Sequence, residues 1–429
     1  AAHRLARAGA AVTVLEAAAR VGGRLRTDDM EGARVDAGVQ LLGSMFTETL
    51  RLARDVGAHG LLARSPGRDA LWSRGRAHEV VYGSAASMLA SGALPFGTKM
   101  RLGATYMPFL HRHDAALSMG ALERAAAAGL DRESIAAWGG REMGRDFVEL
   151  LAAPLLASFY GMRPEETSAG LYHALAHEGR TVEVLAVRGG AGALADAVAA
   201  AVRAGGGEIR LGVVVRGVEP GDEGVTVVSD AGSETYDAVV LAAPAPAARE
   251  VLAAAYPAAA ERLAPVTVRP TATVALLLDR PLGVRYFGLS FPRGESRAVA
   301  AVCVQENKAP GLVPQGSGLL VAIPTPEAGE RLFTLDAQAA LDTVLPDLAR
   351  VFPGIERLLL HARLFRWRHG WTLFPPGSLT RLAGLRRDLP DADGRIALAG
   401  DYLRAPTVEG AVASGIDAAE RIARRLALA

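Results

Sequence analysis

One stretch near the start of the chain combines a carboxylate, two arginines and a glycine pair at a spacing that suits dinucleotide binding. Glu16 follows a short β-branched run, and an acid at the end of the second strand of a βαβ unit can accept hydrogen bonds from both hydroxyls of an adenosine ribose. Gly22 and Gly23 allow the backbone to approach a phosphate, and Arg20 and Arg24 present rigid forks of donors to it. The full spacing favours a cofactor loop over an ordinary charged turn.

A second candidate site lies near the end of the chain, where Gly400 and Asp401 follow a short apolar run typical of a strand. Pro406 and Thr407 are start signals for a helix that would begin near Val408. The start of a helix offers free N–H groups and the positive end of the helix dipole, and both stabilise a negatively charged group. The second stretch therefore also indicates a cofactor site.

The two stretches resemble the superfamily of FAD-dependent amine oxidases, protoporphyrinogen oxidases and carotenoid desaturases, whose members carry Glu, three residues, Arg, one residue and Gly-Gly-Arg after their second strand. The resemblance implies FAD as the cofactor, with Glu16 on the ribose and Asp401 on the ribityl or pyrophosphate region. It also implies that the later helix start points at flavin N1 and C2=O, where reduced flavin is negatively charged. The FAD contacts implied are Glu16, Arg20, Gly22, Gly23, Arg24, Val39, Gln40, Val215, Ala243, Gly400, Asp401, Thr407 and Val408.

Four of these contacts come from segments between the two motifs. By the resemblance, backbone amides at Val39 and Gln40 face the edge of the flavin ring, although a plain strand end is an equally good interpretation of that glycine-punctuated segment. The same resemblance places Val215 at the adenine, through its backbone. Ala243 ends an apolar run that reads as a strand buried on both faces.

The residues before Glu16 lack the Gly-x-Gly-x-x-Gly turn that normally lies about 20 residues ahead of the ribose acid. Counting back places this turn just ahead of Ala1, and the sequence begins with neither Met nor a signal peptide. We therefore expect the sequence to be the interior of a longer reading frame, with the first strand and the Gly-rich turn missing. We also expect the chain beginning at Ala1 to be unstable and to bind FAD poorly, because the neighbours of that strand would lose their hydrogen-bond partners.

Length and composition predict a two-domain α/β protein without a nucleic-acid partner. The 429 residues exceed the roughly 250–300 that one core usually holds, and the net charge of +1 gives no electrostatic case for nucleic acid. The single Cys303 excludes an internal disulfide and is compatible with a reducing cytoplasm. The fold expected is a Rossmann-type FAD-binding domain (residues 1–64, 186–245 and 390–429) with an α+β substrate domain, helical over 65–185 and sheet-forming over 246–389.

Two further patterns carry weaker indications. Residues 94–110 mix Phe, Met and Tyr with Lys99 and Arg101, which favours a buried amphipathic helix over a surface that touches a membrane or lines the mouth of an apolar channel. His173 and His177 have the spacing of a metal pair on a helix, but no further ligand cluster supports a site. We therefore predict no metal and a cytoplasmic protein, with peripheral membrane contact as an alternative.

The distribution of lysines bears on the substrate. Amine oxidases of the superfamily usually have a lysine bound through water to flavin N5, on a strand that corresponds to residues 266–278, and this run contains none. The two lysines of the chain are Lys99 and Lys308. Residues 153–169 and 306–308 look like protoporphyrinogen oxidases, whereas residues 400–415 look more like carotenoid desaturases and squalene-type enzymes.

Hydride transfer to flavin from a large, apolar substrate that is conjugated, or becomes so, fits both resemblances, because conjugation stabilises the developing cation. We predict an FAD-dependent oxidoreductase similar to protoporphyrinogen oxidase, with a carotenoid or phytoene desaturase or a squalene-type enzyme as the alternative. A flavin-containing amine oxidase or a non-catalytic flavin-binding protein is the second alternative. The electron acceptor, oxygen or quinone, stays open, as do the catalytic residues. The substrate contacts implied are Arg188, Trp367, Trp371 and Tyr402.

Overall fold

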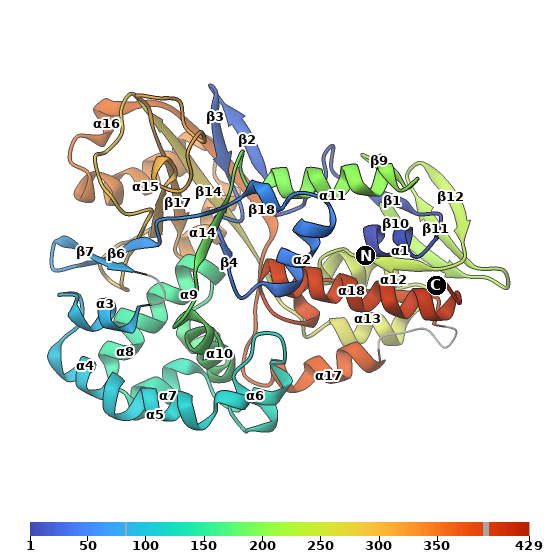
Figure 1. The fold of residues 1–429 in the computed structure, drawn as a ribbon, viewed down its shortest axis with the longest axis horizontal. Coiled ribbons are helices and arrows are strands. Elements are labelled where there is room, and N and C mark those ends of the chain that lie inside the picture. The colour runs from blue at the N-terminus through green and yellow to red at the C-terminus, as the bar shows by residue number, and fades with distance from the viewer. Residues whose placement is uncertain (82–83, 389–393, 429) are drawn as a thin grey trace.

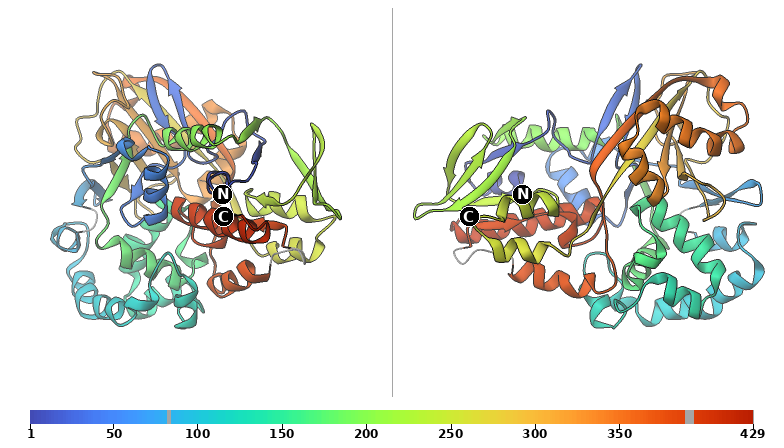
Figure 2. Two further views of the ribbon diagram at one scale, coloured as in Figure 1. Left: turned by 45° about the vertical axis from the view of Figure 1, so that its right-hand side comes forward. Right: turned by 180° about the vertical axis from the view of Figure 1, so that it is seen from behind.

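The computed structural model describes residues 1–81, 84–388 and 394–428. Figure 1 shows two halves: one built on short parallel strands and the long helix α18 (Val408–Arg425), and one built on a large sheet and a block of helices. Both termini lie in the first half, where α1 (Ala2–Arg7) packs against α18 (Figures 1 and 2). Segments from both ends of the sequence therefore form one structural unit.

The first half contains two parallel strand pairs. β1 (Thr13–Glu16) pairs with β9 (Glu208–Leu211), and β13 (Val239–Leu241) pairs with β19 (Ile396–Leu398). Within the described ranges no strand joins the two pairs into one sheet. A first strand ahead of Ala1 stays a prediction.

Helices and an antiparallel meander cover these strands on both faces. Val240 packs towards α1 and α18, and Leu241 packs towards the opposite apolar cluster, which explains why the whole β13 run is apolar. The covering elements are α11 (Gly192–Ala204), β10 (Val215–Pro220), β11 (Val225–Ser229), β12 (Gly232–Tyr236), α12 (Ala245–Leu252), α13 (Pro257–Leu263) and α17 (Ser378–Asp388).

The second half is organised by a seven-stranded mixed sheet in the order β18-β14-β17-β16-β15-β6-β7. Its strands are β6 (Arg68–Ser73), β7 (Arg76–Val81), β14 (Val268–Leu278), β15 (Gly288–Ser290), β16 (Val299–Val304), β17 (Gly318–Pro324) and β18 (Leu359–Thr372). One face packs against α14 (Pro326–Thr334), α15 (Ala337–Val351) and α16 (Ile355–Leu358). The other face packs against the hairpin of β2 (Thr27–Met30) and β3 (Ala33–Asp36). The expected fold class, mixed α/β with a large second sheet, is confirmed.

The helical block has its own aromatic core, in which the fully buried Phe147 packs edge-on against Tyr106 and Tyr172. Two segments have π-helical geometry, Leu102–Tyr106 and Val148–Ala152. The α-helices of the block are α3 (Ala85–Ala90), α4 (Phe96–Arg101), α5 (Met107–Arg112), α6 (Glu123–Ala127), α7 (Ile135–Glu142), α8 (Arg145–Phe147), α9 (Ala153–Tyr160) and α10 (Ala169–Gly179).

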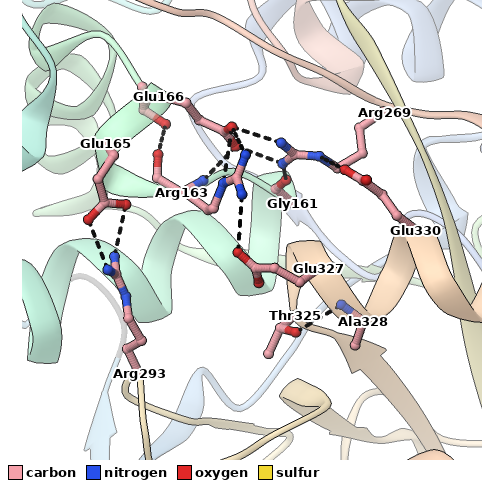
Figure 3. A network of polar contacts seen from close by, with 11 residues as sticks. Gly161, Arg163, Glu165, Glu166, Arg269, Arg293, Thr325, Glu327, Ala328 and Glu330 are labelled. Atoms are coloured by element: carbon pink, nitrogen blue, oxygen red, sulfur yellow. Dashed lines mark hydrogen bonds and ion pairs between the residues drawn. The ribbon is translucent and has the colours of Figure 1, made fainter.

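A charged network joins the helical block to the large sheet (Figure 3). Arg269, on β14, has a side chain only 6% exposed and donates two hydrogen bonds of 2.7 and 2.8 Å to Glu166, which follows α9. Burial alone would raise the pKa of Glu166, but hydrogen bonds from Arg269 and Arg163 outweigh it and lower the pKa to about 2. The carboxylate therefore stays charged over the physiological pH range.

The expectation of a helical run over residues 65–185 needs one correction. Its first part forms β6 and β7, and β6 joins the large sheet by parallel pairing with β15. Ala70 and Trp72 alternate towards the buried face of that sheet, a two-residue period that a helix pattern overlooks. The proposed domain bounds stay predictions, and the bound at 389/390 lies outside the described residues.

Three short strands and one helix lie at the junction between the halves. The strands β4 (Leu42–Gly43), β8 (Val184–Val187) and β5 (Leu62–Arg64) form an antiparallel sheet in that order. Helix α2 (Thr47–Asp55) lacks a cap of its own, and Glu409 of α18 accepts hydrogen bonds from the backbone amides of Glu48 (2.8 Å) and Thr49 (2.9 Å). A carboxylate at a helix start is stabilised by the helix dipole, so this contact ties α2 to α18.

Candidate functional site: a dinucleotide cradle between two loops

Glu16 is the last residue of β1 and lies at the edge of an apolar cluster. One oxygen of its carboxylate accepts a hydrogen bond of 2.8 Å from the backbone amide of Ala18, which orients the group. The neighbouring Leu15 packs in the same cluster as Val215 and Ala243. The structure therefore places the acid predicted for the ribose close to Val215, which was predicted at the adenine, and to Ala243, a further predicted FAD contact.

The loop after Glu16 is closed by its own arginine. Arg20 donates to the carbonyls of Val21 and Gly23, both at 2.9 Å. Gly22 has a φ of +100°, and a Cβ there would lie 2.5 Å from the carbonyl oxygen of Leu25, so only glycine fits. The glycine pair predicted from sequence thus has a structural cause, which is a tight turn against α11.

Arg24 and Asp401, 377 residues apart, form the central contact of the site. The guanidinium of Arg24 donates to Asp401 at 2.7 Å and to the carbonyl of Gly370 at 3.1 Å. The other oxygen of Asp401 accepts a hydrogen bond of 2.9 Å from Thr372 on β18. The side chain of Asp401 is 6% exposed and that of Arg24 is 38% exposed, so the arginine keeps a face accessible to a ligand.

The start of α18 lies beside the same region. Thr407 caps the helix by accepting a hydrogen bond of 3.0 Å from the amide of Gly410. Val408 packs in one apolar cluster with Val39. Gly400 precedes Asp401, and its amide donates a hydrogen bond of 2.9 Å to the hydroxyl of Ser414 on α18. The predicted residues of the second stretch are therefore neighbours of the predicted flavin-edge segment.

The four predicted substrate contacts fall in different places. The ring of Trp367 packs against Gly38, and the Arg26 guanidinium lies 5.8 Å from its centroid. Trp371 instead packs against Gly161 at the end of α9. Tyr402 is buried beside Gly400, and its burial raises the pKa of the phenol. Arg188 is exposed at the end of β8.

The histidine pair on α10 has other partners. His173 is fully buried, and its Nδ1 lies 3.1 Å from the hydroxyl of Tyr106. His177 lies 2.6 Å from Asp114 through its Nε2. Burial lowers the pKa of His173 to about 3, so this imidazole is neutral. No group of three metal-ligating side chains occurs in the described part of the chain.

Sequence reasoning missed one buried polar cluster around Asp36. This residue ends β3, is fully buried, and forms an ion pair with Lys308. Its other oxygen accepts a hydrogen bond of 2.7 Å from the amide of Ala191 at the start of α11. The signal available in the sequence was an acid at a strand end next to the Val39–Gln40 segment, but nothing local identified its partners.

This donor set fits FAD. It offers a carboxylate beside an apolar wall, a phosphate-sized glycine turn, a partly exposed guanidinium, and a helix start whose amides suit a negatively charged ring. The loop after β1 and the loop before α18 meet at the Arg24–Asp401 contact, and the large sheet lies beside it. This arrangement defines the class of two-part FAD-binding oxidoreductase folds.

Comparison with known proteins agrees with that class. The model of the family described as flavin containing amine oxidoreductase matches residues 1–423, and the chain belongs to this family. It is therefore an FAD-dependent oxidoreductase.

Solved structures share the fold at low sequence identity. A putative protoporphyrinogen oxidase from Exiguobacterium sp. 255-15 is 19% identical, with a TM-score of 0.76 over 99% of this chain and 96% of that one. Cyclohexylamine oxidase from Brevibacterium oxydans IH-35A is 21% identical, with a TM-score of 0.77 over the same shares. A putrescine oxidase bound to putrescine is also 21% identical, with a TM-score of 0.75 over 99% of this chain and 96% of that one.

Proposed function

We propose that the protein dehydrogenates a large, apolar substrate that is conjugated or becomes so, in the manner of protoporphyrinogen oxidase. FAD, when bound, supplies the redox chemistry by accepting a hydride equivalent. The residues of this chain hold the cofactor, orient the substrate and exclude water. The observation that carries the proposal is the composition of β14, which has no lysine.

The side chains of β14 that face the cofactor-binding half are small or apolar. Ala275 and Leu277 pack with the β2–β3 hairpin. Thr273 is buried, and its hydroxyl donates to the carbonyl of Ala37 at 2.9 Å, so it is committed to a structural bond. Lys308 is sealed in its ion pair with Asp36. No ammonium group is therefore presented from β14, as expected for a substrate that stabilises its own developing cation.

The test is anaerobic reduction of the bound flavin by a panel of a porphyrinogen, a polyene and several amines. We expect the porphyrinogen to bleach the flavin absorption and the primary amines and polyamines to leave it unchanged. Bleaching by the polyene alone would favour a desaturase. Steady turnover of a simple amine with peroxide release would contradict the proposal, and no bleaching by any compound would indicate a non-catalytic flavin protein. Reoxidation of photoreduced enzyme by oxygen or by a quinone identifies the acceptor.

An exposed apolar surface on the helical block supports a second proposal, that the protein touches a lipid bilayer peripherally. Phe96 and Met100 are one helical turn apart on α4 and are 78% and 55% exposed, and Leu89 of α3 is 40% exposed. Single exposed apolar residues are common, but Phe96 and Met100 lie on one face of α4, and neighbouring exposed apolar side chains are typical of a contact surface. No helix in the described part of the chain is both long enough and apolar enough to cross a bilayer, so the contact proposed is superficial.

Replacing two residues of this surface is expected to weaken lipid binding. The double substitution Phe96→Ser and Met100→Ser should lower the fraction that sediments with phosphatidylcholine vesicles by about tenfold or more, because each buried side chain of this size contributes about 1.5–3 kcal/mol. Leu360→Ser, at a 53% exposed position of β18, is the matched control and should bind as the parent does. Equal sedimentation of all three proteins would refute the contact.

A further inference from the structure

Lys308 stands out among the basic residues of the chain. It is one of two lysines in a sequence with 47 basic residues, and its side chain is 0% exposed. Its ammonium pairs with the carboxylate of Asp36, which is also 0% exposed. A buried charge is tolerated only when it is paired, and removal of one partner leaves the other uncompensated. The pair also joins the β2–β3 hairpin to the turn after β16, because Lys308 follows β16 and Asp36 ends β3.

Asp36 also contacts the start of helix α11. Its second oxygen accepts hydrogen bonds from the amide of Ala191 and from the hydroxyl of Thr27, which in turn accepts from the amide of Gly192 at 2.8 Å. Gly190 has a φ of +95°, and a Cβ there would lie 2.3 Å from Thr27. Because Gly190 has no side chain, the turn before α11 can pass close to Thr27 and to the carboxylate of Asp36.

A second connection runs parallel to the ion pair. The amide nitrogen of Gln40 donates to the carbonyls of Asp36 and Gly38, at 2.5 and 3.3 Å. Because those carbonyls only accept, the oxygen of Gln40 must face the other way, and it accepts from Gln305 at 2.8 Å. Lys308 and Gln305, three residues apart after β16, therefore hold both ends of segment 36–40.

The same segment is attached to the cofactor loop on its other side. The amide of Val39 donates to the carbonyl of Arg24, and the amide of Ala37 donates to the carbonyl of Arg26, both at 3.1 Å. Segment 36–40 is therefore held between the loop that carries Arg24 and the turn after β16 that carries Lys308. A displacement of Asp36 would be transmitted to the residues beside the flavin.

We propose that Lys308 is a positioning residue for FAD: by anchoring Asp36 it fixes segment 36–40, and through it Val39, Gln40 and Arg24, against the cofactor. The proposal rests on the predicted place of Val39 and Gln40 at the flavin edge, and it does not depend on the substrate. An arginine cannot take the place of the lysine, because the planar guanidinium is larger than the ammonium and needs several acceptors in one plane.

The experiment compares Lys308→Met with Lys99→Met, a substitution of the other lysine, which donates to the Ser91 carbonyl in the helical block. In the full chain we would measure the FAD dissociation constant, the visible spectrum and midpoint potential of the bound flavin, and the melting temperature. Lys308→Met should weaken FAD binding by about tenfold or more and alter the spectrum and potential. Lys99→Met should change none of these quantities. Lys308→Arg should show the same weakened FAD binding and altered spectrum and potential as Lys308→Met.

The double substitution Asp36→Asn with Lys308→Met separates positioning from stability. It leaves no uncompensated buried charge, so the melting temperature should return most of the way to that of the parent. FAD affinity, spectrum and potential should stay altered, because residues 36 and 308 still cannot form the ion pair that fixes segment 36–40. A double variant with recovered stability and the FAD affinity, spectrum and potential of the parent would overturn the proposal and leave Lys308 a purely structural residue. The double variant also serves if Lys308→Met alone does not fold.

Discussion

Glu16→Ala is expected to lower the affinity for FAD by roughly tenfold to a hundredfold. Hydrogen bonds to a charged group contribute about 1.5–3 kcal/mol, and every 1.4 kcal/mol is about a factor of ten in affinity. The carboxylate is already oriented by the amide of Ala18, and the apolar wall of Val215 and Ala243 lies next to it. The substitution therefore removes a prearranged acceptor for the ribose and leaves the neighbouring wall in place.

Fluorescence titration of the apoprotein with FAD measures this effect. Glu16→Gln keeps the size and one acceptor oxygen of the side chain but not its charge, so its loss should be intermediate. Glu219→Ala, at an exposed position of β10, is the control and should bind FAD as the parent does. Unchanged affinity in Glu16→Ala would mean that the ribose is held elsewhere.

The free energy of unfolding is expected to fall by about 2 kcal/mol between pH 7 and pH 5 on account of His173 alone. Burial lowers the pKa of this imidazole from 6.5 to about 3 in the folded chain, whereas the unfolded chain titrates near the ordinary value. The unfolded state therefore binds more protons below pH 6.5. Stability from this group is complete above that pH and is lost as the pH falls below it.

Urea unfolding of the parent and of His173→Gln at pH 7 and pH 5 isolates this contribution. Glutamine does not titrate and keeps a polar group near the Tyr106 hydroxyl, and every other titrating group is shared by the two proteins. The parent should lose about 2 kcal/mol more than the variant over this interval. Equal losses would show that His173 does not resist protonation in the folded protein.

The cofactor and the fold class were predictable because the motifs that carry the family resemblance are local in sequence. Glu16, Arg20 and the Gly22–Gly23 pair lie within one strand and one turn, so their relative positions follow from backbone geometry. The helix start at Val408 was likewise indicated by the residues just before it. FAD dependence and membership of the family are confirmed, while the individual site residues and the substrate stay predictions.

The partners of buried charges were decided only by the tertiary structure. Asp36 and Lys308 are 272 residues apart and Arg24 and Asp401 are 377 apart, and no local pattern links them. The same is true of β6, whose place beside β15 depends on the assembly of a sheet from distant segments. The local sequence limits the conformations that each backbone segment can adopt. Which faces of the helices and strands meet depends on how the two halves bury their apolar surfaces together. That packing decides which charges become buried, and a buried charge then needs a particular partner.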